Sequence, residues 1–139
     1  MTGEFPRAGQ VFSYRYLWKW QQDAGETEGR KPRPSCVTVV VRNQSGQTVI
    51  FIAPITSKDP GPKRAALAIP QIEAGRANLD TSLPLWVMVD ELNVDILETS
   101  FTLENRTPLG AFGPGFTTKI VEAIQSVRQS GKLDLAKRT

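Results

Sequence analysis

The sequence predicts an α+β protein, mainly β, in which a small, strongly twisted antiparallel sheet or barrel is closed by a C-terminal helix. Three observations carry this prediction. Residues 11–20 alternate between two sets of side chains with the period of two that is typical of a strand. Residues 35–41 and 48–55 are rich in β-branched side chains and flank a short turn. Only residues 117–131 repeat apolar side chains convincingly at helical spacing.

The other segments follow from their turn residues. Loops or turns are predicted where Gly, Pro and polar side chains gather without periodicity, at residues 21–34, 42–47, 56–64 and 107–115. Residues 65–70 and 85–89 are predicted to be short strands, and acidic turns are expected after the second of them. In the helix, Thr117 or Thr118 can cap the start and Gly131 can end it.

The length and composition indicate one globular unit. A chain of 139 residues can form one domain with a real core and is short for two, so we predict a single domain over residues 1–139. Within it we expect a short N-terminal tail at 1–8 and a basic C-terminal tail at 131–139. No apolar run approaches the roughly 20 residues that cross a bilayer, and the N-terminus lacks the apolar centre of a signal peptide. The cytoplasm is therefore the expected location, with no membrane partner.

The rare residue types exclude several kinds of site. Histidine is absent and Cys36 is the only cysteine, which excludes an internal disulfide, a Cys/His zinc site and a Ser-His or Cys-His nucleophile pair. Cys36 lies in a β-branched run, so we expect it to be a buried apolar filler. An enzyme with this composition would move protons with carboxylates, Thr, Tyr or Lys, and would stabilise charge with Arg. We expect no cofactor and no metal.

Basic residues gather in particular parts of the chain. The net charge is +3, and the clustered residues are Arg7, Arg15, Lys19, Arg30, Lys31, Arg33, Lys58, Lys63, Arg64, Lys132, Lys137 and Arg138. Such clusters suit a polyanion such as a nucleic acid. A solvated basic rim would give the same pattern.

Short motifs in order along the chain resemble those of the PemK/MazF/Kid family, the toxins of type II toxin–antitoxin systems. They are AGQVF (8–12), GRKPRPSCVTVVV (29–41), APITS (53–57), WVMVDEL (86–92) and LGAF (109–112). The resemblance implies an SH3-like barrel with added helices, usually a homodimer. It also implies a metal-independent endoribonuclease that cleaves single-stranded RNA, including mRNA, and is neutralised by a cognate antitoxin.

The resemblance also implies catalytic residues. Arg33 falls on the arginine of the family's Arg-Pro element, and Thr56 on the threonine that closes the following strand. An acidic residue that some members have five positions before that arginine falls on Glu28, with Glu26 as an equal alternative. Asp90, in the later acidic segment, is a further candidate.

The chemistry supports these residue types independently. RNA cleavage by its own 2′-hydroxyl needs a base for that proton, a cation for the five-coordinate phosphorane and an acid for the leaving 5′-oxygen. Arg33 can offer a fork of donors to two phosphate oxygens, and Thr56 can donate its hydroxyl to the same phosphate. Glu28 or Asp90 could then act as the base.

Further residues are expected to bind RNA beside this clamp: Arg30, Lys31, Ser57, Lys58, Trp18 and Trp20. The two tryptophans belong to a face of five alternating rings, which is more than one small core holds. Phe12 and Tyr14 are expected in the core, whereas Trp18 and Trp20 run towards the basic loop.

The acidic segment departs from the family pattern. It reads DELNVDI (90–96), with Asn93 where many members have an arginine. Two positions before Asp90, Met88 stands where Kid-like members have a second arginine. Cationic support near Asp90 is therefore expected to be missing. The alternative to an enzyme is a non-catalytic SH3-like module that binds nucleic acid or a protein target, either like the related gyrase poisons or as a diverged, inactive toxin.

Overall fold

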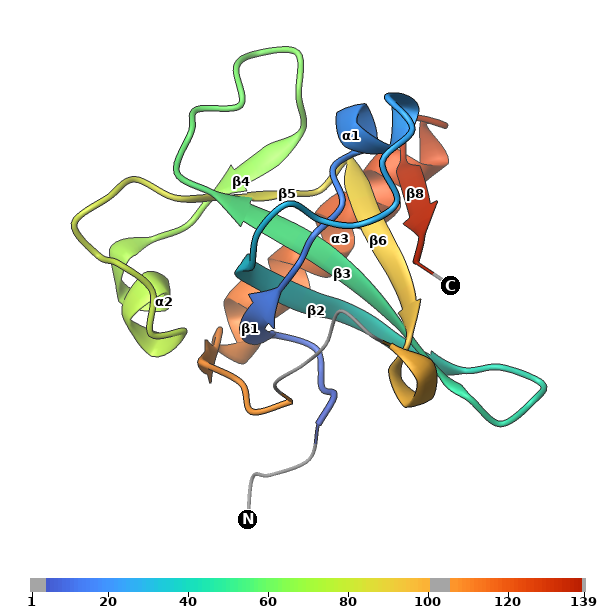
Figure 1. Cartoon of the computed structure of the whole chain (residues 1–139). Coiled ribbons are helices and arrows are strands. Elements are labelled where there is room, and N and C mark those ends of the chain that lie inside the picture. Colours follow the sequence, from blue (N-terminus) through green and yellow to red (C-terminus); the bar gives the residue numbers. More distant parts are fainter. Residues whose placement is uncertain (1–4, 101–105, 139) are drawn as a thin grey trace.

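A computed structural model describes residues 5–100 and 106–138. Within these ranges eight strands join in one mainly antiparallel sheet, accompanied by short and long helices (Figure 1). The elements are β1 Gln10–Tyr14, α1 Lys19–Asp23, β2 Arg33–Arg42, β3 Thr48–Thr56, β4 Ala66–Ala68, α2 Gln71–Arg76, β5 Trp86–Met88, β6 Glu91–Ile96, the 3-10 turn η1 Leu97–Thr99, β7 Gly110–Ala111, α3 Pro114–Gln129 and β8 Asp134–Lys137. The predicted class, mainly β with α, is confirmed.

The sheet is open. Its main path runs β4, β5, β3, β2, β1 and β7, while β6 pairs with β3 and β8 pairs with β6. In the part of the chain that the structure describes, the end strands β4 and β7 do not pair with each other, so a closed barrel is not found. Among the described helices, none is long and apolar enough to cross a membrane.

The β-branched runs correctly predict the two strands β2 and β3, whose hairpin forms the centre of the sheet. Gly46 in its turn has a φ of 79°, a left-handed conformation that favours glycine. The register pairs Ser35 with Pro54. Continued by two residues, this register places Arg33, the first residue of β2, opposite Thr56, the last residue of β3. Both residues therefore lie at one end of the hairpin.

Apolar clusters cover both faces of the sheet. Helix α3 lies across one face (Figure 1), where Ile120 and Ile124 pack with buried strand residues. Phe12 and Tyr14 belong to the cluster on the other face, which confirms their predicted core positions. Cys36 is buried in β2, as expected of an apolar filler, and burial raises the pKa of its thiol to about 12.

The predicted strand over residues 11–20 is wrong beyond Tyr14, where β1 ends and the chain turns into α1. Side chains, rather than a neighbouring strand, bond the intervening backbone. The Asn93 amide accepts from the backbone N–H of Leu17 at 2.9 Å and donates to its carbonyl at 2.8 Å. The Asn93 side chain thus bonds both backbone groups of Leu17, so this segment needs no neighbouring strand to satisfy them.

Two further predictions are corrected on the strands that follow. The expected acidic turns after residue 89 are wrong, because residues 91–96 form β6 between β3 and β8. Asp95 of β6 is buried and accepts from the Tyr14 hydroxyl at 2.7 Å, so the acidic residues of this strand need not face solvent. The predicted tail at 131–139 is also wrong, because it contains β8, which pairs in parallel with β6.

The chain ends and helices differ from prediction in smaller ways. Helix α3 begins earlier than expected, with Gly113 as its N-cap, and Thr117 instead donates its hydroxyl to the Gly113 carbonyl at 2.9 Å. Gly131, with a φ of 77°, follows the helix as predicted. Helix α2 has no counterpart in the prediction. Of the predicted tail at 1–8, residues 1–4 lie outside the described residues, and Phe5 stacks edge-on against Phe12 at 5.5 Å.

Gly29 holds the loop between α1 and β2 against the segment that follows β1. It is buried, and a β-carbon at this position would lie 2.3 Å from the carbonyl oxygen of Arg15. Only glycine permits so close a backbone approach. The loop is thereby fixed beside the start of β2 and the residue Arg33.

Candidate functional site

A pocket of about 500 Å³ opens beside the end of the hairpin. We name it the tryptophan pocket, and it is lined by Trp18, Trp20, Arg33, Thr56, Ser57, Lys58, Asp59, Pro60, Arg64 and Met88. Its walls come from the start of α1, from β2, β3 and β5, and from the loop between β3 and β4, which projects from the sheet in Figure 1. Aromatic, basic and acidic side chains therefore meet in one hollow.

A second pocket of about 340 Å³ lies next to the first. We name it the leucine pocket, and its lining residues are Lys31, Pro32, Arg33, Pro34, Ile55, Thr56, Ser57, Leu79, Asp80, Leu83 and Leu85. Four of these eleven residues come from the loop between α2 and β5: Leu79, Asp80, Leu83 and Leu85. Arg33, Thr56 and Ser57 line both pockets, so they form the wall between them.

Arg33 presents a cation on this wall. Its guanidinium lies over the ring of Trp18, 5.3 Å from the centroid, a contact that orients the side chain. Within residues 5–100 and 106–138, no carboxylate forms an ion pair with Arg33. Partial burial lowers its pKa, but an arginine remains charged at neutral pH. Its donors are therefore available to an anion.

Thr56 presents a hydroxyl on the same wall. Its oxygen accepts a hydrogen bond from the backbone N–H of Lys58 at 3.1 Å, which holds the side chain in place. Because the oxygen is the acceptor in this bond, the hydroxyl hydrogen can still donate. Arg33 and Thr56 together can therefore donate to several oxygens of one bound phosphate.

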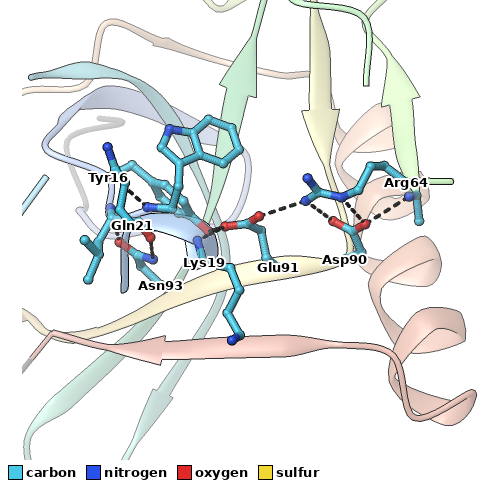
Figure 2. Close-up of polar contacts among 10 residues, drawn as sticks. Tyr16, Lys19, Gln21, Arg64, Asp90, Glu91 and Asn93 are labelled. Atoms are coloured by element: carbon cyan, nitrogen blue, oxygen red, sulfur yellow. Dashed lines mark hydrogen bonds and ion pairs between the residues drawn. The ribbon is translucent and has the colours of Figure 1, made fainter. Parts of the chain in front are cut away.

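Arg64 is the second arginine of the tryptophan pocket. Figure 2 shows its fork on Asp90: Nε and Nη2 donate to the two carboxylate oxygens at 2.8 Å each. Nη2 also donates to Glu91 at 2.7 Å, and Asp90 accepts the backbone N–H of Ala65 at 3.1 Å. Hydrogen bonding to Asp90 is the main reason why the pKa of Arg64 is raised. This fork fastens the loop between β3 and β4 to the turn between β5 and β6.

Glu91 extends the network into the interior (Figure 2). It is buried, and its other oxygen accepts from the Tyr16 hydroxyl at 3.1 Å and from the backbone N–H of Lys19 at 3.0 Å. Burial raises the pKa of Glu91 against the opposing effect of these donors and of Arg64. Burial beside Glu91 also raises the pKa of Tyr16. The network ties the start of α1, and with it the two tryptophans, to β6.

The expected lack of cationic support near Asp90 is wrong, because Arg64 supplies it from a distant part of the sequence. Met88 is buried and lines the tryptophan pocket. Asn93 is fully buried and bonds to Leu17, so it serves the backbone rather than an acidic site. Asn93 thus has a structural role of its own in this chain.

The other residues that sequence reasoning selected for catalysis lie apart from the wall. Glu28 is exposed and lines neither pocket. Its alternative, Glu26, forms a two-pronged ion pair with Arg30 at 2.7 and 3.1 Å. Asp90 lies beside the tryptophan pocket, with both oxygens engaged by Arg64.

The residues predicted to bind RNA lie mostly around the two pockets. Trp18, Trp20, Ser57 and Lys58 line the tryptophan pocket, and Lys31 and Ser57 line the leucine pocket. The exposed fraction of Trp20 is 54%, and the Arg30 guanidinium lies over its ring at 4.8 Å. These side chains form an aromatic and basic rim, to which Arg30 belongs through its contact with Trp20, although it lines neither pocket.

Sequence reasoning missed Asp59 and treated Arg64 only as one basic loop residue. Both lie in the segment DPGPKR, where Gly61 donates its backbone N–H to Asp59 at 2.9 Å. Asp and Gly at this spacing predict a turn that fixes the aspartate, and this signal could have selected Asp59. Nothing in the local pattern pairs Arg64 with Asp90, since that contact spans two strands.

The described residues contain no group of three or more acidic, histidine or cysteine side chains that could hold a metal ion. No model of a known protein family matches the chain. No curated protein matches it either. Its function must therefore be inferred from the two pockets and from the sequence motifs.

Proposed function

We propose that this chain is a toxin-like, metal-independent endoribonuclease that cleaves single-stranded RNA through the RNA's own 2′-hydroxyl. One observation carries the proposal: Arg33, with no carboxylate partner in the described chain, and Thr56 stand together on a wall between two pockets. A phosphate bound to this wall would have a pocket on each side for the two nucleosides that it joins. This arrangement suits an internal phosphodiester better than a terminal phosphate.

The rim favours unpaired bases. Trp20 is more than half exposed, and Trp18 lies beside the pocket under Arg33. Aromatic faces stack with bases of any sequence, and each stack stabilises a single strand by about 1–3 kcal/mol. A base held in a duplex could not enter either pocket without unpairing. Single-stranded RNA is therefore the proposed substrate.

The cleavage step follows from these positions. Arg33 and Thr56 donate to the non-bridging oxygens as negative charge builds on the five-coordinate phosphorane. The 2′-oxygen bonds to phosphorus and loses its proton to a carboxylate, and the bond from phosphorus to the 5′-oxygen breaks. The leaving oxygen takes a proton from the ammonium of Lys58, which lines the same pocket. The products are a 2′,3′-cyclic phosphate and a 5′-hydroxyl, and no water is consumed.

Asp59 is our proposed base. It lines the tryptophan pocket with Arg33 and Thr56, and one of its oxygens is held by the backbone N–H of Gly61. Within the described residues its other oxygen accepts no hydrogen bond, whereas both oxygens of Asp90 are engaged by Arg64. Asp59 can therefore accept a proton without breaking an ion pair.

The motif resemblance extends the proposal to partners. A cytoplasmic homodimer and a cognate antitoxin are part of the same inference. An acidic antitoxin segment would compete with RNA for Arg33, which has no carboxylate partner among the described residues, and for Lys58 and Lys31 on the rims of the two pockets. Inhibition by such a segment would be relieved at high salt.

The test incubates purified protein with end-labelled single-stranded RNA in EDTA, beside Arg33→Ala and Thr56→Val. We expect cleavage with cyclic phosphate ends, a loss of roughly 100-fold or more for Arg33→Ala, and a smaller loss for Thr56→Val. Arg42→Ala is the matched control, because Arg42 lies at the opposite, exposed end of β2 and should leave the rate unchanged. A duplex of the same sequence should resist cleavage.

Two results would contradict the proposal. If wild-type protein binds the RNA but leaves it uncut, the chain is a non-catalytic binding module. If the Arg33 and Thr56 variants cut as fast as wild type, the wall between the pockets is not the site. Thermal unfolding of each variant checks that lost activity does not come from lost folding.

A further inference from the structure

We infer that the leucine pocket selects the base next to the cleaved phosphate, favouring bases with an amino group on their pairing edge over uracil, and that Asp80 determines this preference. The inference rests on the proposed function and assigns a role to the second pocket. No family motif quoted above includes Asp80 or the loop that carries it.

Asp80 is held with one oxygen open. Its Oδ1 accepts both the backbone N–H of Ser82 at 2.9 Å and the Ser82 hydroxyl at 2.6 Å. In the described parts of the chain, no hydrogen bond or ion pair reaches Oδ2. The bonds from Ser82 lower the pKa of Asp80, so the carboxylate is ionised at neutral pH. Asp80 thus presents a fixed acceptor at the leucine pocket.

The rest of the pocket suits a flat ring. Leu79, Leu83 and Leu85 come from the loop between α2 and β5, and Ile55 comes from β3. These apolar side chains can cover the faces of a base, while Lys31 and Asp80 supply charged groups for its edge. Arg33 and Thr56 border the same pocket, so a base bound there belongs to a nucleoside next to their phosphate.

The chemistry of the edge sets the preference. Adenine, cytosine and guanine each carry an amino group that can donate to a carboxylate, whereas uracil has carbonyl oxygens in the corresponding places. A carboxylate accepts hydrogen bonds but cannot donate them. The pairing edge of uracil offers it only N3–H, which lies between two carbonyl oxygens, so those oxygens would repel Asp80 more than an edge with an amino group does. One well-placed edge contact typically changes preference by about tenfold or more.

The experiment first maps the bond that wild type cleaves in a mixed-sequence RNA. The two nucleotides that flank this bond are then varied, one at a time, among all four bases, and kcat/KM is measured. We expect uridine to be cleaved about tenfold or more slowly at one of the two positions. Asp80→Asn should remove this difference, because an amide can also donate to uracil.

Asp134→Asn is the matched control. It makes the same change of charge at an exposed residue of β8 that lines neither pocket, so the preference should persist. Asn at position 80 can still accept from Ser82, so Asp80→Asn should keep the melting temperature of wild type. Restoration of uridine cleavage by a folded variant would therefore report on the base contact.

The outcomes separate this inference from the proposed function. Equal cleavage of all four bases at both positions, or a preference that survives Asp80→Asn, would overturn the inference while leaving the nuclease intact. If wild type cuts no RNA, the nuclease proposal fails, and affinities for the same oligonucleotides replace the rates. Equal affinity of wild type for all four bases would then overturn the base preference as well.

Discussion

Replacing Asn93 by alanine should destabilise the fold by about 3–5 kcal/mol. The Asn93 side chain is fully buried and makes three hydrogen bonds: with the N–H of Leu17 at 2.9 Å, its carbonyl at 2.8 Å, and Nη1 of Arg138 at 2.9 Å. Alanine would leave the two Leu17 backbone groups buried without partners, at about 1–3 kcal/mol each. The lost bond to Arg138 would cost less, because Arg138 also donates to the Arg15 carbonyl at 2.7 Å and so keeps a partner.

Urea denaturation followed by tryptophan fluorescence measures this change, with Trp18 beside Leu17 as a local reporter. Asn93→Asp should also destabilise the fold, because the carboxylate keeps both acceptor bonds but sets its second oxygen against the buried Leu17 carbonyl in place of a donor. Gln44→Ala, at an exposed position in the turn between β2 and β3, should change stability by no more than about 0.5 kcal/mol. A loss below about 1 kcal/mol for Asn93→Ala would refute the claim that this amide satisfies the backbone after β1.

Two other changes test the packing and the charge network. Gly29→Ala should destabilise the fold by about 2 kcal/mol or more, because the new β-carbon would clash with the Arg15 carbonyl. Gly115→Ala in α3 is the control, because its β-carbon would contact no other atom, so this change should be neutral or stabilising. Melting temperatures compare the two variants. The raised pKa of Glu91 means that the native state holds this proton more tightly than the unfolded chain, so stability should fall as pH rises from the usual value near 4.5 through the raised one. Urea titrations across this pH range should show a smaller fall in the free energy of unfolding for Glu91→Gln than for wild type. An equal fall in both proteins would assign the effect to other titratable groups.

The hairpin and the pairing of Arg33 with Thr56 at its end could be predicted from sequence because their signals are local. β-branched runs and the turn at Gly46 fix β2 and β3, and the register then places Arg33 opposite Thr56. Burial of Phe12 and Tyr14 follows from the same alternation that predicts β1. Each of these features depends on a few neighbouring residues.

The remaining features depend on contacts between distant segments. The strand signal of residues 15–20 is overridden because Asn93, from β6, takes the place of a strand neighbour. In residues 91–96 the apolar Leu92, Val94 and Ile96 alternate with polar side chains, which is a strand pattern. The acidic residues suggested turns instead, because only the fold shows that Glu91 and Asp95 are bonded inside the protein. Arg64 could not be assigned to Asp90 for the same reason, since only the folded sheet brings them together.

The position of Arg138 imposes an order of events during synthesis. This residue follows β8 and donates to the Asn93 side chain at 2.9 Å and to the Arg15 carbonyl at 2.7 Å. The ribosome adds residue 138 long after residue 15, so the early segment that carries Trp18 cannot complete these bonds until β8 and Arg138 have emerged. A nascent chain can form the β2–β3 hairpin early, but the segment that carries Trp18 would be completed only after β8 has formed. Activity of the proposed nuclease would then require that β8 and Arg138 have already been synthesised.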